Sequence, residues 1–546
     1  MSRKLADKLI VAAILLAVAL LYRKAARLWW VSDDLYQVHL AAEHRVLDCF
    51  FDRSLWQSTP SQLFTPFVTA SFRTELDLFG PDPRPFYAVQ LALLAIIAIA
   101  LAFTLRLWMS RAGAACAAFL FLAGTPTAVM ASELMLVHYL ESVILSIGSA
   151  ALFAIGMRSQ RRLHRIGSAL LYLMAILAKE IALPLPAVLL FLPERDVRAR
   201  LRAMWPHAVA ILVYFVWRYA MLGKWLGGYA WTFGVSGVPA LALRTAWNIV
   251  RTFAGPRFGI GLPLLMVIGA GVLLRLRSRV NLAGVAIAFA VAIGPILPVA
   301  VHYEHRFAWP AWICAAIVFA AGADTLRDRR IMLAVMIAAP MVALFANRQQ
   351  WNSEFRTAKR MSDEGRVFTD LGGGDLLRMP AIPAGEMFQL AWVKEFMLHR
   401  SAGTLWFYDD LYLCAGAKPR RVFGFDERSR QVRDLTAEIP AIVRRYCASI
   451  RSNEPLQLHF HFDDRHRLLT WDLGPYQDGY TVVTGNGFLA YDVKRRDGLQ
   501  LFAEKGLTFR LRYQSPQGWV TYSPELSLDL TKDQDVVWQR PSALSS

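Results

Sequence analysis

The sequence predicts a multi-span, all-α membrane domain at residues 1–346, followed by a soluble, β-rich or mixed α/β domain at 347–546. Hydrophobic residues make up 55% of the 546 residues and gather in long runs bounded by charge or proline, as in transmembrane helices. Basic clusters stand beside these runs. Residues 455–540 alternate apolar and polar side chains between turn motifs, which indicates an antiparallel sheet, expected as a small sandwich.

The first apolar run, 9–22, is expected to be a retained span, because no small-residue cleavage site follows it. When the later basic clusters are placed in the cytoplasm, about eleven spans alternate along the chain. The N-terminus then lies in the cytoplasm and residues 347–546 lie outside it, as in an integral protein of a bacterial inner membrane. The expected spans are 9–22, 86–106, 112–129, 137–157, 166–178, 180–193, 206–222, 258–274, 281–300, 308–323 and 331–346.

Charge and motif content exclude several function classes. The net charge of +18 is concentrated beside apolar runs, so membrane topology explains it better than a nucleic-acid partner does. The sequence has no P-loop, dinucleotide fingerprint, zinc spacing or nucleophile elbow, which disfavours soluble, nucleotide-driven chemistry. Cys414 and Cys447 lie in the polar C-terminal part, where an oxidising compartment would permit pairing, although spacing alone does not establish the bond.

Two adjacent carboxylates, Asp33 and Asp34, follow Trp29-Trp30 near the predicted outer end of the first span. A carboxylate in this position can act as a general base or as a ligand of a divalent cation. The alternative is a solvated helix cap.

Charged residues also mark three later junctions between predicted spans. Lys179 and Glu180 separate two apolar segments, and ionisable residues at membrane depth are functional candidates unless they form a structural ion pair. Arg306 with His305 could clamp an anionic phosphate, or could belong to an ordinary polar loop. Arg218 could supply a second cation.

Two further residues are expected to support this site. The planar guanidinium of Arg73 could pair with a carboxylate or phosphate, or could reach towards lipid headgroups. His138, three residues before Glu141, could shuttle protons or bind metal, although its position favours a hydrogen-bonded structural role.

Taken in order, these segments resemble the multi-span glycosyltransferases of the GT-C type, in particular the protein O-mannosyltransferase and transmembrane-tetratricopeptide superfamily. The similarity covers about residues 25–355, after which this chain enters a strand-rich domain instead of tetratricopeptide repeats. The segments that carry it are Ser32-Asp33-Asp34, Thr65-Pro66 with Ser71-Phe72-Arg73, Gly80-Pro81-Asp82-Pro83, Ala178-Lys179-Glu180, Trp217-Arg218-Tyr219 and His305-Arg306-Phe307.

The resemblance implies a polyprenyl-phosphate sugar as donor and an acidic residue of the first outer loop, Asp33 or Asp34, as the catalytic residue. It also implies that Arg306, with Arg218, binds the lipid phosphate. The expected reaction is a single inverting displacement in which Asp33 is the base, Asp34 orients the acceptor or an optional divalent ion, and Lys179 assists Arg306. The acceptor would be a hydroxyl of a protein, glycolipid or polysaccharide.

Two other classes of function share these sequence features. A transporter or flippase of a lipid-linked glycan would also have apolar spans and buried charges, but would place polar groups along a path through the midplane. A noncatalytic membrane scaffold that presents the C-terminal domain is the third reading.

Overall fold

A computed structural model forms the basis of the description that follows. It describes residues 3–31, 33–58, 63–223, 225, 238–255, 279–297, 303–367, 375–378, 382–383, 405–407, 409–416, 418–426, 431–464, 468–484, 489–500 and 506–541. These residues divide into two compact units, one extending to Lys359 and one beginning at Arg360. The prediction of a helical membrane domain followed by a β-rich domain is confirmed.

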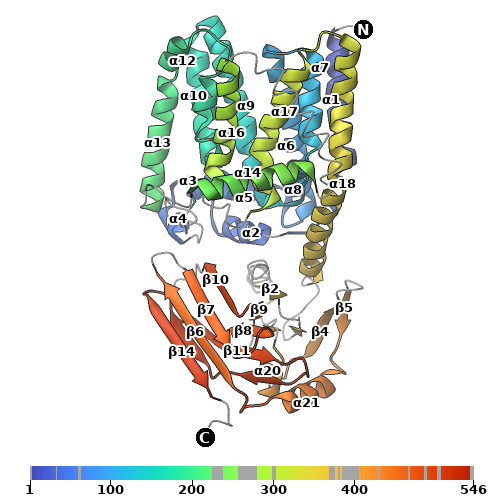
Figure 1. Cartoon of the computed structure of the whole chain (residues 1–546), viewed down its shortest axis with the longest axis vertical. Helices are drawn as coiled ribbons and strands as arrows, with labels where there is room; N and C mark the ends of the chain where they lie inside the picture. The colour runs from blue at the N-terminus through green and yellow to red at the C-terminus, as the bar shows by residue number, and fades with distance from the viewer. Residues whose placement is uncertain are drawn as a thin grey trace. The chain divides into compact units, whose positions relative to one another are not determined.

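The first unit is a bundle of long helices (Figure 1). Among the described residues, five helical segments are long and apolar enough to cross a membrane, and the bent pair α7 (Arg111–Leu122) and α8 (Thr125–Ser132) would make a sixth. The five belong to α1 (Arg3–Tyr22), α6 (Pro83–Thr104), α9 (Val137–Ser159), α17 (Trp309–Ala323) and α18 (Arg329–Val367). This chain is therefore an integral membrane protein.

The remaining predicted spans lie on shorter or less apolar elements. Those at 166–178 and 206–222 fall on α10 (Arg162–Ala178) and α13 (Trp205–Leu222), and 281–300 begins on α16 (Arg279–Ile293). The span at 180–193 is broken into η4 (Glu180–Ala182) and α11 (Leu185–Leu189), where Pro184 and Pro186 interrupt the pattern. The span at 258–274 lies outside the described residues.

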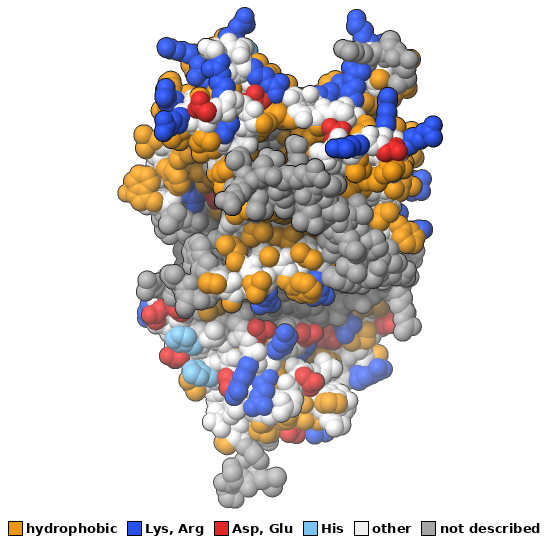
Figure 2. Space-filling model, turned by 45° about the horizontal axis from the view of Figure 1, so that its top comes forward, with side chains coloured by type: hydrophobic (Ala, Val, Ile, Leu, Met, Phe, Trp, Pro, Cys, Tyr) orange, Lys and Arg blue, Asp and Glu red, His pale blue; other side chains and the backbone are white. Residues whose placement is uncertain are grey.

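The two ends of the bundle differ in charge and architecture. The start of α1, the basic helix α12 (Val197–Ala203) and the start of α18 lie at one end (Figure 1). Figure 2 shows Lys and Arg gathered there above a band of hydrophobic side chains. The opposite end is built from shorter helices, which are α2 (Asp34–Glu43), α3 (Asp48–Phe51), α4 (Arg53–Ser58), α5 (Pro66–Phe79) and α14 (Val238–Ala254).

The bend between α7 and α8 is fixed by close packing at Gly124. The two helices meet at 60°, and Pro126 lies in the first turn of α8. A Cβ atom on Gly124 would lie 2.1 Å from Nε1 of the buried Trp312, so only glycine fits. The indole N–H of Trp312 in turn donates to the carbonyl of Phe121 at 3.1 Å. This packing brings α8 beside α17.

The second unit contains a four-stranded sheet, in the order β3-β1-β4-β5, and two further sheets that form a sandwich. Phe460 of β6 and Phe509 of β11 stack with ring centroids 4.8 Å apart, which joins the sandwich sheets β10-β7-β6-β14 and β12-β11-β8-β9-β2. Inward residues of β6 alternate with exposed ones, as the sequence predicts. The strands are β1 (Asp375–Arg378), β2 (Ile382–Pro383), β3 (Leu405–Phe407), β4 (Arg421–Asp426), β5 (Gln431–Asp434), β6 (Leu456–Asp463), β7 (Leu468–Gly474), β8 (Tyr480–Thr484), β9 (Leu489–Val493), β10 (Arg496–Gln500), β11 (Gly506–Gln514), β12 (Val520–Tyr522), β13 (Leu526–Asp529) and β14 (Gln534–Arg540).

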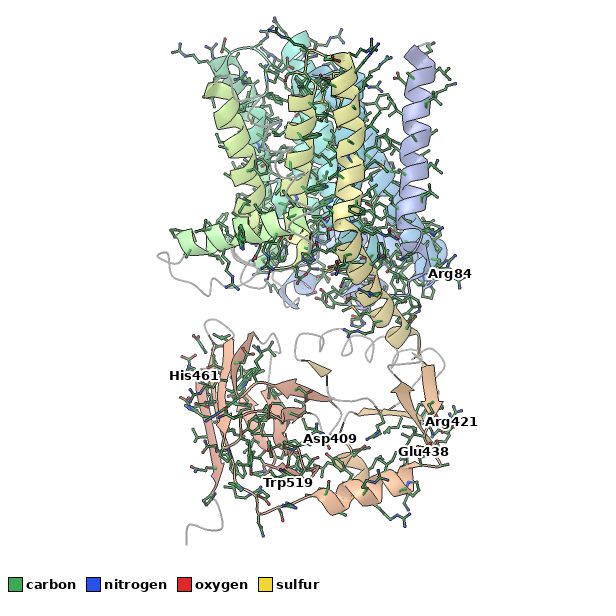
Figure 3. The ribbon with its side chains drawn as sticks, turned by 45° about the vertical axis from the view of Figure 1, so that its right-hand side comes forward. Arg84, Asp409, Arg421, Glu438, His461 and Trp519 are labelled. Atoms are coloured by element: carbon green, nitrogen blue, oxygen red, sulfur yellow. A yellow bond between two sulfur atoms is a disulfide. The ribbon has the colours of Figure 1, made fainter. Side chains whose placement is uncertain are left out.

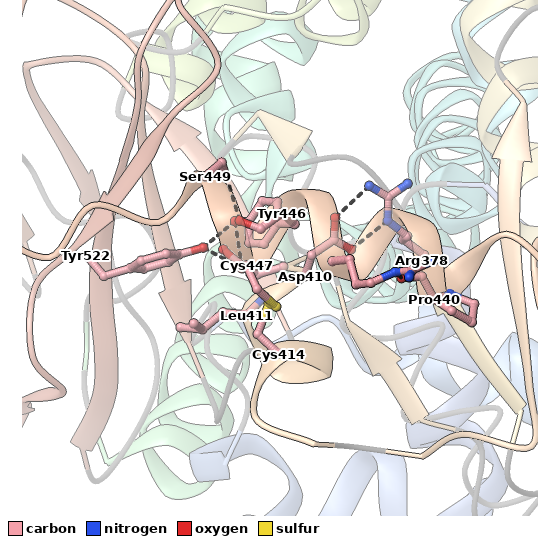
Figure 4. The surroundings of a disulfide bond; sticks show 11 residues. Arg378, Asp410, Leu411, Cys414, Pro440, Tyr446, Cys447, Ser449 and Tyr522 are labelled. Carbon is pink, nitrogen blue, oxygen red and sulfur yellow. Dashed lines mark hydrogen bonds and ion pairs between the residues drawn. A yellow bond between two sulfur atoms is a disulfide. The ribbon is translucent and has the colours of Figure 1, made fainter.

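A disulfide and a buried carboxylate tie this unit together. Cys414 of α20 (Leu411–Cys414) is bonded to Cys447 of α21 (Ile439–Ser449) (Figure 4). Asp409, at the start of α20, is fully buried (Figure 3) and accepts hydrogen bonds from the hydroxyl of Tyr522 at 2.8 Å and from Arg512 at 2.9 Å. Because each oxygen has a donor, the buried charge is compensated.

The boundary between the units differs in position from the expected change of domain after residue 346. Helix α18 continues without interruption to Val367, and the compact units divide after Lys359. The last apolar span and the first polar helix of the sequence are therefore one structural element.

Candidate active site

Asp34 is a structural carboxylate at the start of α2. Its side chain is fully buried, one oxygen accepts the N–H of Val31 at 2.8 Å, and the other accepts the N–H of Met135 at 2.7 Å. Burial raises the pKa of Asp34 well above its usual range, although these two hydrogen bonds oppose that shift. Asp34 therefore fixes the first loop against the turn that follows α8.

Asp33 has a different environment although it is the adjacent residue. It is half-buried at the N-cap position of α2, and none of the side-chain hydrogen bonds found among the described residues involves it. Burial raises the pKa of Asp33, whereas the nearby charge of Arg306 lowers it. The structure thus places a carboxylate with raised basicity beside a guanidinium.

Arg306 belongs to η7 (His305–Ala308), and its side chain lies between two acidic side chains from outside this element. Its Nε is 2.7 Å from Oε2 of Glu304, and its Nη1 is 3.4 Å from Oε2 of Glu133. The side chains of Arg306 and Glu133 are only 14% and 21% exposed, so this pair is partly shielded from bulk water, and this shielding strengthens charge pairing.

Glu133 occupies the turn between α8 and η3 (Leu134–Leu136), and that turn is pinned from two sides. Gln90 of α6 donates to the carbonyls of Met130 at 2.6 Å and Glu133 at 3.0 Å, while Asp34 holds the N–H of Met135. Burial, opposed by Arg306, raises the pKa of Glu133 to about 7. Sequence reasoning did not assign Glu133 to the site, although it is an acid between two apolar segments, the same signal that singles out Lys179 and Glu180.

His305 points to α18 rather than to Glu133. Its Nδ1 is 2.8 Å from Oε1 of Glu354, and the amide nitrogen of Gln350 lies 2.6 Å from its Nε2. These contacts hold η7 against α18 and thereby position Arg306, its neighbour in the chain.

Lys179 and Arg306 approach the first turn of α9 from different elements. The Nζ of Lys179 lies 4.9 Å from the centre of the Tyr139 ring, within the range of cation–π attraction. Both cations are close enough to the imidazole of His138 to interact with it electrostatically. His138 itself is buried and bonded through Nδ1 to the carbonyl of Met135 at 2.6 Å.

Three other residues singled out in the sequence make local structural contacts. Arg218 forms an ion pair with Glu180, and Tyr214 joins them through hydrogen bonds of 2.7 Å to Glu180 and 3.0 Å to Arg218. Arg73 pairs with Asp77 at 2.8 Å and donates to the carbonyl of Ala41 near the end of α2. The structure therefore brings Asp33, Lys179 and Arg306 towards one region, and gives Arg218, Glu180 and Arg73 partners of their own.

Within the described ranges, no group of three or more His, Cys, Asp or Glu side chains has an arrangement that could hold a metal ion. Each oxygen of Asp34 accepts one main-chain hydrogen bond.

Comparisons with known proteins give likenesses among solved structures. No protein-family profile matches the chain, and no curated protein matches it. Among solved structures, the chain is similar to the crystal structure of ArnT from Cupriavidus metallidurans bound to undecaprenyl phosphate, with 13% identity and a TM-score of 0.36 over 78% of this chain and 94% of that chain. A likeness at this identity and TM-score assigns no activity to this chain.

Proposed function

We propose that this protein is an inverting glycosyltransferase that moves a sugar from a polyprenyl-phosphate carrier to an acceptor hydroxyl. The observation that supports this most directly is that a half-buried carboxylate, Asp33, lies within electrostatic range of a nearly buried cation, Arg306, at the end of an apolar helical bundle. A base and an anion-binding group are the two elements that such a displacement requires.

In the proposed reaction, Asp33 accepts the proton of the acceptor hydroxyl while that oxygen bonds to the anomeric carbon. The bond from the anomeric carbon to the phosphate oxygen breaks, and the polyprenyl phosphate leaves with the electron pair. A single displacement inverts the anomeric configuration. Burial raises the pKa of Asp33 and so makes its carboxylate a stronger base, while the charge of Arg306 opposes that rise.

Arg306 would bind the phosphate and stabilise the charge that grows on it. Its guanidinium can present two parallel N–H groups to phosphate oxygens. Lys179, whose Nζ lies 4.9 Å from the centre of the Tyr139 ring, would add a second positive charge. Asp34 acts as a positioning residue in this scheme, since its carboxylate holds the main chain on either side of the site.

The proposed site would face away from the cytoplasm. Lys and Arg gather at the opposite end of the bundle, and basic residues favour the cytoplasmic side of membrane proteins. The Cys414–Cys447 disulfide agrees with an extracytoplasmic second unit, because such bonds persist in oxidising compartments.

Transfer by the purified protein tests this proposal. Full-length protein in lipid nanodiscs would be given radiolabelled polyprenyl-phosphate sugars and a panel of hydroxyl acceptors, and Asp33→Asn would be the matched variant. We expect transfer by the wild type and its loss in the variant. In sealed vesicles that contain the protein, movement of the intact lipid-linked sugar across the membrane without transfer would favour a flippase instead. Absence of both transfer and movement with every donor would favour a scaffold.

A further inference from the structure

In the structure, the guanidinium that would bind the donor phosphate is already paired with protein carboxylates. Glu133 meets Nη1 and Glu304 meets Nε of Arg306. Nη1 and Nε are two of the nitrogen atoms through which the guanidinium would bind an anion. A phosphate arriving beside an ionised Glu133 would place two anions on one cation, and charge repulsion in a partly buried place opposes that arrangement.

We propose that Glu133 is a latch on the donor site: its carboxylate holds Arg306 when the site is empty, and must lose its charge or leave Arg306 before the donor phosphate can bind. This inference rests on the proposed function, because it takes Arg306 to be the phosphate-binding group. It assigns Glu133 as a positioning residue that regulates access to the donor site.

The two carboxylates on Arg306 differ in a way that singles out Glu133. The Glu304 side chain is 50% exposed, so water stabilises its charge, whereas the Glu133 side chain is only 21% exposed. The main chain at Glu133 is also held by Gln90 through its carbonyl. Because the turn is fixed, release of Arg306 is expected through rotation or neutralisation of the carboxyl group and not through movement of the backbone.

The surroundings of Glu133 favour neutralisation at near-neutral pH. Negative charges face it from Glu304, from Asp33 before α2 and from Glu354 on α18, while Arg306 supplies the opposing positive charge. Burial, reinforced by the three negative charges and opposed by Arg306, raises the pKa of Glu133 to about 7. The latch is therefore closed above neutral pH and open below it.

The experiment is a binding measurement that does not depend on transfer. Full-length protein in nanodiscs would be titrated with a short-chain polyprenyl methyl phosphate, a diester whose charge is constant between the two pH values used. The variants are Glu133→Gln, which keeps the shape without the charge, and the matched control Glu304→Gln, which removes the exposed carboxylate from the same guanidinium. Arg306→Ala reports on the phosphate site itself.

With a pKa of about 7, about a tenth of the wild type is binding-competent at pH 8 and about nine tenths at pH 6. The wild-type Kd should therefore be about tenfold higher than that of Glu133→Gln at pH 8 and nearly equal to it at pH 6. Glu304→Gln should still show a rise in Kd with pH, but the rise should begin at lower pH than in the wild type, because the charge of Glu304 helps to raise the pKa of Glu133.

Each contrary outcome has one meaning. Equal Kd values for wild type and Glu133→Gln at pH 8, with binding lost in Arg306→Ala, would overturn the latch and leave the phosphate site in place. Unchanged binding in Arg306→Ala would refute the phosphate site of the proposed function. If Glu133→Gln does not fold, the wild type alone remains decisive, because a Kd independent of pH from 6 to 8 contradicts the latch.

Discussion

Asp33 and Asp34 are adjacent in the chain, but their carboxylates have opposite roles in the structure. Asp34 is fully buried and accepts main-chain hydrogen bonds from Val31 and Met135. Asp33 is half-buried and has Arg306 as its nearby opposite charge. One carboxylate therefore maintains the geometry in which the other can react.

This difference predicts separable effects for two matched substitutions. Asp33→Asn should reduce transfer by about 10²-fold or more, the usual contribution of a general base, and should leave the melting temperature unchanged. Asp34→Asn should instead destabilise the protein by about 1–3 kcal/mol, because an amide nitrogen would face a main-chain N–H in a buried place. Thermal unfolding in detergent and transfer rates would be measured on both proteins, and a stability loss confined to Asp33→Asn would contradict this division.

Arg306 is expected to act on the donor and not on protein stability. Arg306→Ala should lower kcat/KM for the lipid donor by about 10²–10³-fold, the usual effect of losing one electrostatic contact to a developing charge. Arg306→Lys should recover part of this loss, since lysine restores the charge but lacks the planar guanidinium that can form two parallel hydrogen bonds to phosphate. Steady-state kinetics with varied donor would measure this, and equal losses in the Ala and Lys proteins would indicate that geometry alone matters.

The dependence of transfer on acidity should follow Asp33. Burial raises its pKa above the ordinary aspartate value of 3.8, and the base must be ionised to accept a proton. The contribution of this base is therefore complete above that pKa and is lost as pH falls through it, so the acid limb of kcat/KM lies above pH 3.8. Any decline of kcat/KM above neutral pH is assigned to closure of the Glu133 latch and not to Asp33. A profile that stays level to pH 3.8 would rule out Asp33 as the base.

The Arg218–Glu180 pair should contribute to stability and not to donor binding. Glu180→Gln would leave the Arg218 guanidinium buried without its carboxylate, which typically costs about 3 kcal/mol. We expect a lower melting temperature together with an unchanged Kd for the polyprenyl methyl phosphate. Weakened donor binding at full stability would instead return Arg218 to the phosphate site.

Orientation can be tested by reporter fusions. Alkaline phosphatase joined after Arg348 should be active, and a reporter that requires the cytoplasm should be silent, because the second unit contains a disulfide and α18 starts at the basic end of the bundle and is long enough to cross the membrane before Arg348. The reverse pattern would place Asp33 and Arg306 on the cytoplasmic side.

The sequence predicts the elements of this protein better than their contacts. Hydrophobic runs and period-two alternation reflect which side chains are buried within one element. The sequence pattern therefore predicts the helical unit, the strands of the sandwich and the residues at the ends of spans. The partner of a charge depends on which spans become neighbours. Nothing local to Arg218 shows that it pairs with Glu180, and nothing local to Arg306 shows Glu133 beside it. The pairing of Cys414 with Cys447 likewise depends on how α20 and α21 pack together, which the sequence spacing does not show.

The hydrogen bond from Met135 to Asp34 has a consequence for biosynthesis. Its two residues are 101 positions apart, and Glu133 and Arg306 are 173 positions apart. While the ribosome is still making the intervening helices, Asp34 lacks the N–H of Met135 as its second hydrogen-bond donor, and Glu133 lacks the guanidinium of Arg306. The early part of the chain therefore enters the membrane with acids whose partners have not yet been synthesised. Insertion of the first helices must tolerate these acids at the water-facing rim, and the site reaches its final electrostatic balance only after Arg306 has left the ribosome.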